Sequence, residues 1–149
     1  MSKGKTIEVK YETLVTVWLA LLMSQVLFVV LVYFAKPELL TFDLSRPFLG
    51  ESPLITVVFA AIAIVFFVLS LVLSRQHMRR AEQDQDAGCV QTGLVLGCAL
   101  AEIPSLLGLV LAFAFEHPYF YLWIALGIVG VLAHFPRRGN LIAAGARQA

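Results

Sequence analysis

Charged side chains are scarce in this sequence. Asp, Glu, Lys and Arg together make up 14 % of its 149 residues, whereas hydrophobic residues make up 60 %. An ordinary soluble domain has roughly 25 % charged and about 45–50 % apolar residues. The shortage of charge therefore excludes a typical soluble domain and indicates an integral membrane protein in a lipid bilayer. The formal net charge of +1 also lacks the basic excess that favours nucleic acid, so we expect no nucleic-acid partner.

Cysteine is also rare, and metal-ligand patterns are absent from the sequence. Cys89 and Cys98 are expected on one helix, too far apart to form a disulfide. None of the three histidines, His77, His117 and His134, lies four residues from another metal ligand, so solvated or interfacial positions are expected for them. The sequence has no nucleophile–base pair, glycine-rich phosphate loop or nucleotide fingerprint. We therefore expect no metal, no cofactor and no catalytic site.

Long apolar runs are what the sequence has instead. Four of them, residues 14–35, 54–74, 93–115 and 119–135, are long enough, or nearly so, to cross about 30 Å of hydrocarbon. Each run is predicted to be a helix, because backbone groups in lipid must be satisfied within the segment. The sequence thus predicts an all-α integral membrane protein. Residues 1–149 would form a single domain of four transmembrane helices, paired as antiparallel hairpins.

Basic residues predict how these helices are oriented. Nine of them lie at the N-terminus, between the second and third runs, and at the C-terminus: Lys3, Lys5, Lys10, Arg75, Arg79, Arg80, Arg137, Arg138 and Arg147. The two connections on the opposite side hold only Lys36 and Arg46. Positive charge favours the cytoplasmic side. We therefore expect a multi-pass protein of the inner (plasma) membrane with both termini in the cytoplasm.

The connecting segments are predicted to be loops of two kinds. Residues 36–53 mix prolines with Leu and Phe and are expected to lie on the membrane surface. Residues 75–87 are strongly polar and expected in water, either as a helical extension with solvated charges or with their basic half on anionic lipid headgroups and their acidic half facing water. The aromatic residues from Tyr119 to Trp123 predict a belt at the outer interface, and Tyr11 and Trp18 predict one near the inner interface.

The stretch CALAEIPSLLGLVLAF, from Cys98 to Phe113, contains one ionisable carboxylic acid, Glu102. The other nine acidic residues lie in predicted loops or termini. Burying a carboxyl group in a membrane helix costs at least about 2.5 kcal/mol, and the neutral form is the less costly one there. Two interpretations remain open. Glu102 takes up and releases a proton, or it is a protonated donor that holds helices together.

Small residues accompany this acid along its helix. Four of them recur every four positions and form a ridge on which another backbone can pack closely: Gly93, Gly97, Ala101 and Ser105. Gly108 extends a neighbouring row. Pro104 cannot donate a backbone hydrogen bond, which frees a carbonyl oxygen near Glu102. We therefore expect Glu102 to lie beside a close helix contact.

The run ALAEIPSLLGLVLAF resembles the second helix of the c subunit, or proteolipid, the membrane rotor subunit of rotary ATPases. The resemblance implies that Glu102 is the ion-carrying carboxylate and that Pro104 and Gly108 pack around it. It further implies a subunit that works as a homo- or hetero-oligomer with other membrane subunits. Four helices correspond to the doubled form of this family, with Gln25 in the place of a second acid.

Aligning Gln25 with Glu102 puts both at a comparable depth, on helices that run outward from the cytoplasm. Gln25, and Ser105 on the acid's own helix, are therefore the candidate partners of Glu102 in an ion-binding site. Sodium needs several oxygen ligands, to which Gln25, Ser24 and Ser105 could contribute, so a proton is the simpler ion. Two functions follow. The chain is a proton-carrying subunit, at most a non-catalytic part of an ion-translocating ATPase, or it is a structural or assembly protein in which Glu102 hydrogen-bonds to Gln25.

Overall fold

The computed structural model describes residues 3–40, 47–84 and 87–145, and these ranges are almost entirely helical. The elements in chain order are α1 (Lys3–Ala35), the 3₁₀ helix η1 (Pro37–Leu40), α2 (Pro53–Asp84), α3 (Ala87–Phe115), α4 (Tyr121–Ala133) and α5 (Arg138–Gly145). No strand occurs in the described ranges. The prediction of an all-α fold is confirmed.

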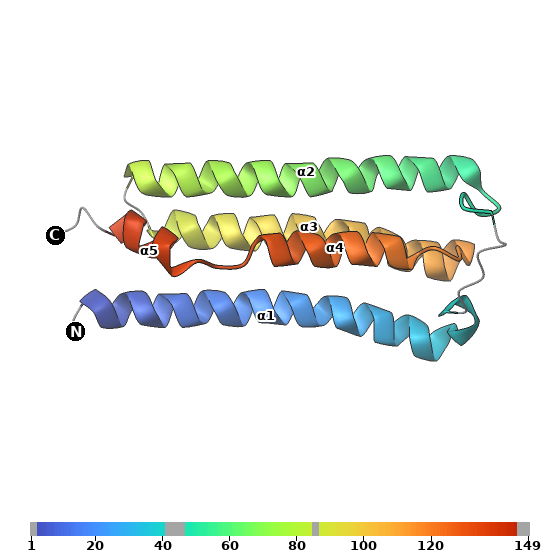
Figure 1. Cartoon of the computed structure of the whole chain (residues 1–149), viewed down its shortest axis with the longest axis horizontal. Helices are drawn as coiled ribbons and strands as arrows, with labels where there is room; N and C mark the ends of the chain where they lie inside the picture. Colours follow the sequence, from blue (N-terminus) through green and yellow to red (C-terminus); the bar gives the residue numbers. More distant parts are fainter. Residues whose placement is uncertain (1–2, 41–46, 85–86, 146–149) are drawn as a thin grey trace.

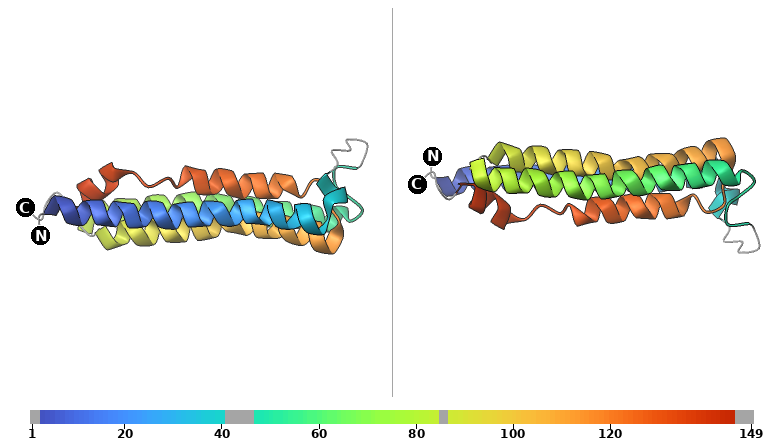
Figure 2. Two further views of the ribbon diagram at one scale, coloured as in Figure 1. Left: turned by 90° about the horizontal axis from the view of Figure 1, so that it is seen from below. Right: turned by 90° about the horizontal axis from the view of Figure 1, so that it is seen from above.

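The helices lie side by side, with α3 and α4 between α1 and α2 (Figure 1). Successive long helices run in opposite directions. The start of α1, the end of α2, the start of α3 and α5 therefore share one end of the bundle (Figures 1 and 2). We call this the basic end, because eight basic residues of the described ranges lie there: Lys3, Lys5, Lys10, Arg75, Arg79, Arg80, Arg137 and Arg138. The turn between α3 and α4 lies at the opposite end.

Three of the helices are long and apolar enough to cross a membrane, over Glu8–Ala35, Pro53–Ala81 and Gly88–Phe115. The fourth predicted run, residues 119–135, contains only the 13-residue helix α4. At 1.5 Å per residue a helix of this length spans about 20 Å, less than the roughly 30 Å of a bilayer core. Pro136 disfavours a helical conformation at the residue before it, so α4 ends nearby.

The helices extend beyond the predicted runs at the basic end. α1 begins at Lys3, and α2 continues as helix through Asp84, so residues 75–84 form the helical extension that was one of the two expectations for this stretch. The reason is that this polar stretch contains Arg, Gln, Met, Glu and Ala, which favour helix, and neither Gly nor Pro before Asp84. The charged residues Arg75, Arg79 and Arg80 are exposed on the surface of this helical extension.

The connection between α1 and α2 differs in part from expectation, and aromatic residues of the predicted belt pack at a turn. Leu39 is buried while Phe48 is exposed, and residues 41–46 of this connection lie outside the described residues. Tyr119, Phe120 and Trp123 are buried against the bundle at the turn between α3 and α4, and the aromatic belt at the outer interface stays a prediction. These rings fill the space at the turn where α3 meets α4.

Buried apolar side chains form two clusters. The cluster nearer the basic end contains Leu14, Ala81, Val90, Leu94, Cys98, Ala101, Val131 and Leu141. The cluster nearer the opposite end contains Val32, Leu39, Ala63, Leu111, Ala112, Phe120, Trp123 and Ile124. Between these clusters along α1 and α3 lie the buried residues Gln25 and Ser105 and the half-buried Glu102. The candidate site residues thus lie between two apolar cores.

Candidate functional site

Four polar residues, Ser24, Gln25, Glu102 and Ser105, form what we call the polar layer. Its level is fixed by Trp18, whose indole N–H donates to the Val131 carbonyl oxygen at 2.8 Å. α1 and α4 are antiparallel. Gln25, seven residues after Trp18 on α1, therefore lies at the same depth in the bundle as Ile124, seven residues before Val131 on α4. The hydroxyl of Ser105 donates to the Ile124 carbonyl oxygen at 3.3 Å. Gln25 and Ser105 therefore lie at one depth.

Gln25 belongs to the stripe of α1 that faces the bundle. This stripe consists of Leu14, Trp18, Leu21, Gln25, Phe28 and Val32. The spacing alternates between four and three residues, as in a helix that packs along another helix. Gln25 is fully buried, and neither atom of its amide has a hydrogen-bond partner among the described residues. The hydrogen bond between Gln25 and Glu102 that the structural hypothesis required is therefore not formed.

Glu102 is paired with Ser24. The Ser24 hydroxyl lies within hydrogen-bond distance of two acceptors, the Leu21 carbonyl oxygen on its own helix at 2.7 Å and Oε1 of Glu102 on α3. A hydroxyl has one proton to donate. If Glu102 is ionised, only one of the two acceptors receives it. If Glu102 is neutral, its own O–H donates to Ser24 while Ser24 donates to Leu21, and both contacts are satisfied.

Ser105 lies three residues after Glu102, so its side chain points about 60° away around α3, toward α4. It is fully buried and faces α4, where a Cβ added at Gly127 would overlap its hydroxyl oxygen. The same Cβ would lie 3.1 Å from the Ala101 carbonyl oxygen. Ser105 is thus part of the close contact between α3 and α4. The structure brings together Glu102 and Ser24, and it does not bring Ser105 or Gln25 into hydrogen-bond contact with the acid.

The small-residue ridge of α3 contacts two helices. A Cβ at Gly93 would lie 2.6 Å from Cβ of His77 on α2, and one at Gly108 would lie 2.8 Å from Cβ of Trp123 on α4. All five residues expected to pack closely are buried: Gly93, Gly97, Ala101, Pro104 and Gly108. The ridge therefore faces α2 and α4, whereas Glu102 faces α1.

Two histidines that the sequence predicted to be solvated or interfacial are buried. His117, in the turn after α3, is 3 % exposed, and His134, after α4, is 6 % exposed. Nδ1 of His117 accepts a hydrogen bond from the Tyr119 backbone N–H at 3.2 Å. Burial lowers the pKa of His117, and the Leu49 carbonyl opposes this more weakly. Gly50, with φ of +65°, packs against the His117 ring where a Cβ would come within 2.8 Å of Cδ2.

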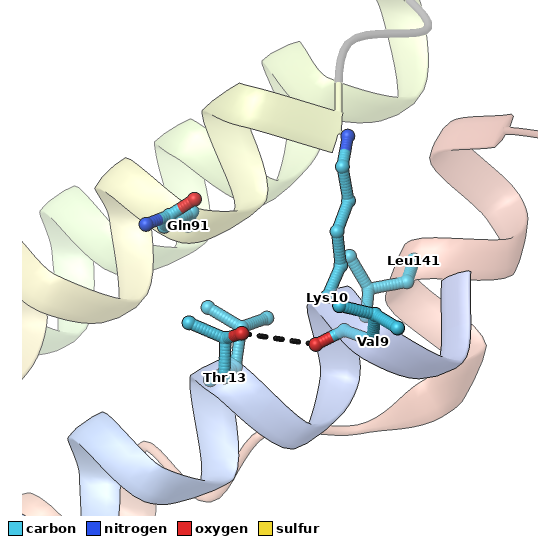
Figure 3. Close-up of a pocket in the computed structure, with 6 residues that line it drawn as sticks. Val9, Lys10, Thr13, Gln91 and Leu141 are labelled. Atoms are coloured by element: carbon cyan, nitrogen blue, oxygen red, sulfur yellow. Dashed lines mark hydrogen bonds between the residues drawn. The ribbon is translucent and has the colours of Figure 1, made fainter. Parts of the chain in front are cut away.

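A small cavity of about 90 Å³ lies at the basic end, away from the polar layer (Figure 3). Its lining comes from three helices: Val9, Lys10, Thr13 and Leu14 of α1, Gln91 of α3 and Leu141 of α5. The Thr13 hydroxyl donates to the Val9 carbonyl oxygen at 2.9 Å, so its polar group is already bonded (Figure 3). No predicted site residue lines this cavity.

Among the described residues, no group of three or more His, Cys, Asp or Glu side chains could hold a metal ion. Neither Cys89 nor Cys98 forms a disulfide. Comparison with known proteins finds no matching family model, no matching curated protein and no matching solved structure. The resemblance to the c subunit therefore depends on the residues around Glu102 alone.

Proposed function

We propose that this chain is a four-span membrane subunit that carries a proton on Glu102, in the manner of the rotor c subunit. The observation that supports this most directly is the pairing of Glu102 with Ser24. Since the Ser24 hydroxyl also has Leu21 as an acceptor, the neutral form of the acid satisfies the local hydrogen bonds best. A carboxyl group kept neutral in an apolar helix is one that can gain and lose a proton.

The half-buried position of Glu102 also suits proton exchange. Its side chain lies at the contact of α1 and α3 and remains partly accessible from outside the bundle. The apolar runs, residues 14–35, 54–74, 93–115 and 119–135, contain no Lys or Arg. The basic group that draws the proton from Glu102 therefore comes from another subunit, so the proposal includes an oligomer or a larger membrane assembly.

The proposal places α1, α2 and α3 across the inner (plasma) membrane, with α4 and its flanking residues as the fourth span. Both termini are cytoplasmic in this arrangement, because the basic residues gather at the end of the bundle where α1 begins and α5 lies. The turn between α3 and α4 then faces outward. The cargo is a proton, and sodium is disfavoured because Ser24 is the one described side chain that bonds the carboxyl group.

The proposal is tested with dicyclohexylcarbodiimide, which reacts with protonated carboxyl groups in apolar surroundings. The whole protein in lipid vesicles is treated across a range of pH, and the labelled residue is identified by mass spectrometry. We expect labelling of Glu102 that decreases at high pH and is absent in Glu102→Gln. Glu116 is the internal control, because its hydrogen bond to Lys36 lowers its pKa and it is exposed. Absence of labelling at Glu102 at every pH would overturn the proposal.

The same Ser24–Glu102 contact supports the second candidate, a structural protein in which the acid holds α1 against α3. Glu102→Gln separates the two functions, because the amide can still donate to Ser24. In the proton-carrying subunit this substitution abolishes proton flux in membrane vesicles that contain the full assembly, without lowering the unfolding midpoint. In the structural protein neither quantity changes. Glu102→Leu is the matched variant that removes the hydrogen bond in both cases.

A further inference from the structure

His134 follows the last residue of α4 and is enclosed by three helices. Its Nδ1 lies 2.6 Å from the Gly130 carbonyl oxygen on α4, and its Nε2 lies 3.2 Å from the Ser70 carbonyl oxygen on α2. On α3 the ring lies over Gly97, where a Cβ would come within 2.6 Å of Nε2. The ring is thus held between two backbone acceptors in a space that only glycine leaves open.

The two carbonyl contacts restrict the protonation state of the His134 ring. A carbonyl oxygen only accepts hydrogen bonds, and a neutral imidazole has one N–H and one bare nitrogen. A neutral ring would therefore direct a lone pair at one of the two carbonyl oxygens, in a site that excludes water. An imidazolium donates to both.

We propose that His134 is an imidazolium in the folded protein, a buried proton-binding site separate from Glu102 that ties α2 to the end of α4. This inference does not depend on the proposed function, because it rests on contacts that Glu102 does not make. Since the apolar runs contain no Lys or Arg, His134 is the one cation that they contribute to the interior of the bundle.

The surroundings of His134 favour a positive charge. The residue occupies the C-cap of α4, and the carbonyl groups at the end of a helix carry partial negative charge. The ionisable groups on the neighbouring segments are Arg75, His77, Arg79, Arg80, Glu82 and Asp84 on α2, Cys89, Cys98 and Glu102 on α3, and Arg137 and Arg138 after α4. Nδ1 of His77 is already bonded to the Leu73 carbonyl oxygen at 2.9 Å. The five arginines are exposed, so water screens their charge from the ring.

His117 provides a matched contrast within the same chain. It is as buried as His134, but its Nδ1 accepts a hydrogen bond from a backbone N–H. That nitrogen must be bare, so His117 is neutral. Two histidines of equal burial are therefore expected in opposite protonation states at the same pH, because one faces a donor and the other faces two acceptors.

The test is nitrogen NMR of the full chain in lipid nanodiscs at pH 7, with ¹⁵N-labelled histidine. The double variant His77→Gln, His117→Gln leaves His134 as the sole histidine, so its signals need no further assignment. We expect both ring nitrogens of His134 to show directly bonded protons. In the wild-type chain we expect a second histidine, lost in His117→Gln, with one bare nitrogen.

A single bare nitrogen on His134 would overturn the inference. Gly97→Ala gives an independent check, because the added methyl group displaces the ring from its carbonyl partners and the doubly protonated signal should then be lost. If that signal persists unchanged in Gly97→Ala, the two carbonyl contacts do not hold the proton and the inference also fails. Glu102→Gln should leave the signal in place, which distinguishes this site from the one proposed above.

Discussion

α3 meets its neighbours through two contacts of opposite character. Toward α4 it presents Ala101, Ser105 and Gly108, and the glycines Gly127 and Gly130 of α4 allow the backbones to approach closely. Toward α1 it presents Glu102, and α1 supplies Ser24 beside the unpartnered Gln25. One contact is closely packed with a single hydrogen bond from a side chain to the backbone. The other contains a carboxyl group and an amide.

The two contacts differ in how much they stabilise the bundle. Close packing of small residues stabilises helix pairs in a membrane without burying unpaired polar groups. By contrast, each polar atom of Gln25 that is buried without a partner costs roughly 1–3 kcal/mol. The contact between α1 and α3 is thus less stable than an apolar one of equal area. We therefore assign the proposed proton-carrying activity to the contact between α1 and α3, because it keeps polar groups buried at a cost in free energy.

The largest effect is expected from closing the space between α3 and α4. In Gly127→Val the first added carbon overlaps Ser105 and presses on the Ala101 backbone, which cannot move aside as a flexible side chain would. Overpacking of this kind costs about 1–3 kcal/mol or more, so we expect a loss of about 3 kcal/mol in the free energy of unfolding. The unfolding midpoint in mixed detergent micelles measures it.

Gly139→Val is the control for this prediction, because nothing lies within 4 Å of the added carbon. It should change the free energy of unfolding by less than about 0.5 kcal/mol. Equal losses in the two variants would show that the glycines of α4 do not determine how closely α3 and α4 pack, and the comparison of the two contacts would fail.

A smaller effect of opposite sign is expected in the polar layer. Gln25→Leu replaces the unpartnered amide with an apolar side chain in the buried stripe of α1, so we expect stabilisation of roughly 1–2 kcal/mol. The same unfolding measurement applies, with Met23→Leu on the exposed side of α1 as a neutral control. Destabilisation by Gln25→Leu would mean that a bound water or ion satisfies the amide, and the α1 contact would then not be a costly one.

The sequence predicted the helices and the depth of the polar groups, but not their partners. Apolar composition alone determines the all-α fold, and the pairing of Ser24 with Glu102 agrees with the expected common depth of Gln25 and Glu102. Consecutive helix residues point about 100° apart, so depth does not decide which of Ser24 and Gln25 meets the acid. The buried stripe of α1 could have shown which residue meets the acid. Its residues are spaced alternately by four and three, so Gln25 belongs to the stripe and points inward, whereas Ser24 lies at its edge.

The histidines show a second limit. The ridge containing Gly97 predicted a close contact, and a close contact exists there. A glycine in a sequence shows that space is needed without showing which residue fills it, and His134 lies almost forty residues away. The aromatic residues from Tyr119 to Trp123 likewise do not show which of their rings are buried, because an interfacial belt and a packed turn have the same composition.

The smallest effect is expected at the turn where the contact between α3 and α4 ends, where His117 is buried. Burial lowers its pKa below the ordinary value of 6.5, so the unfolded chain binds the proton more readily than the folded chain. The stabilisation is complete above pH 6.5 and is lost as the pH falls through the lower pKa of the folded state. Protonation also removes the lone pair that accepts the Tyr119 N–H.

Trp123 reports this step, since its ring lies 5.5 Å from that of His117 and an imidazolium quenches indole fluorescence. In Trp18→Phe, where Trp123 is the sole tryptophan, we expect fluorescence to fall with a midpoint below pH 6.5 and to stay constant in Trp18→Phe, His117→Gln. Glu38, Glu51, Glu116 and His117 all line one cavity of about 690 Å³ at the end of the bundle opposite the basic end. The second variant separates the titration of these carboxylates from that of His117. A midpoint above pH 6.5 would mean that the carboxylates control the protonation of His117, and the turn between α3 and α4 would then depend on their charge.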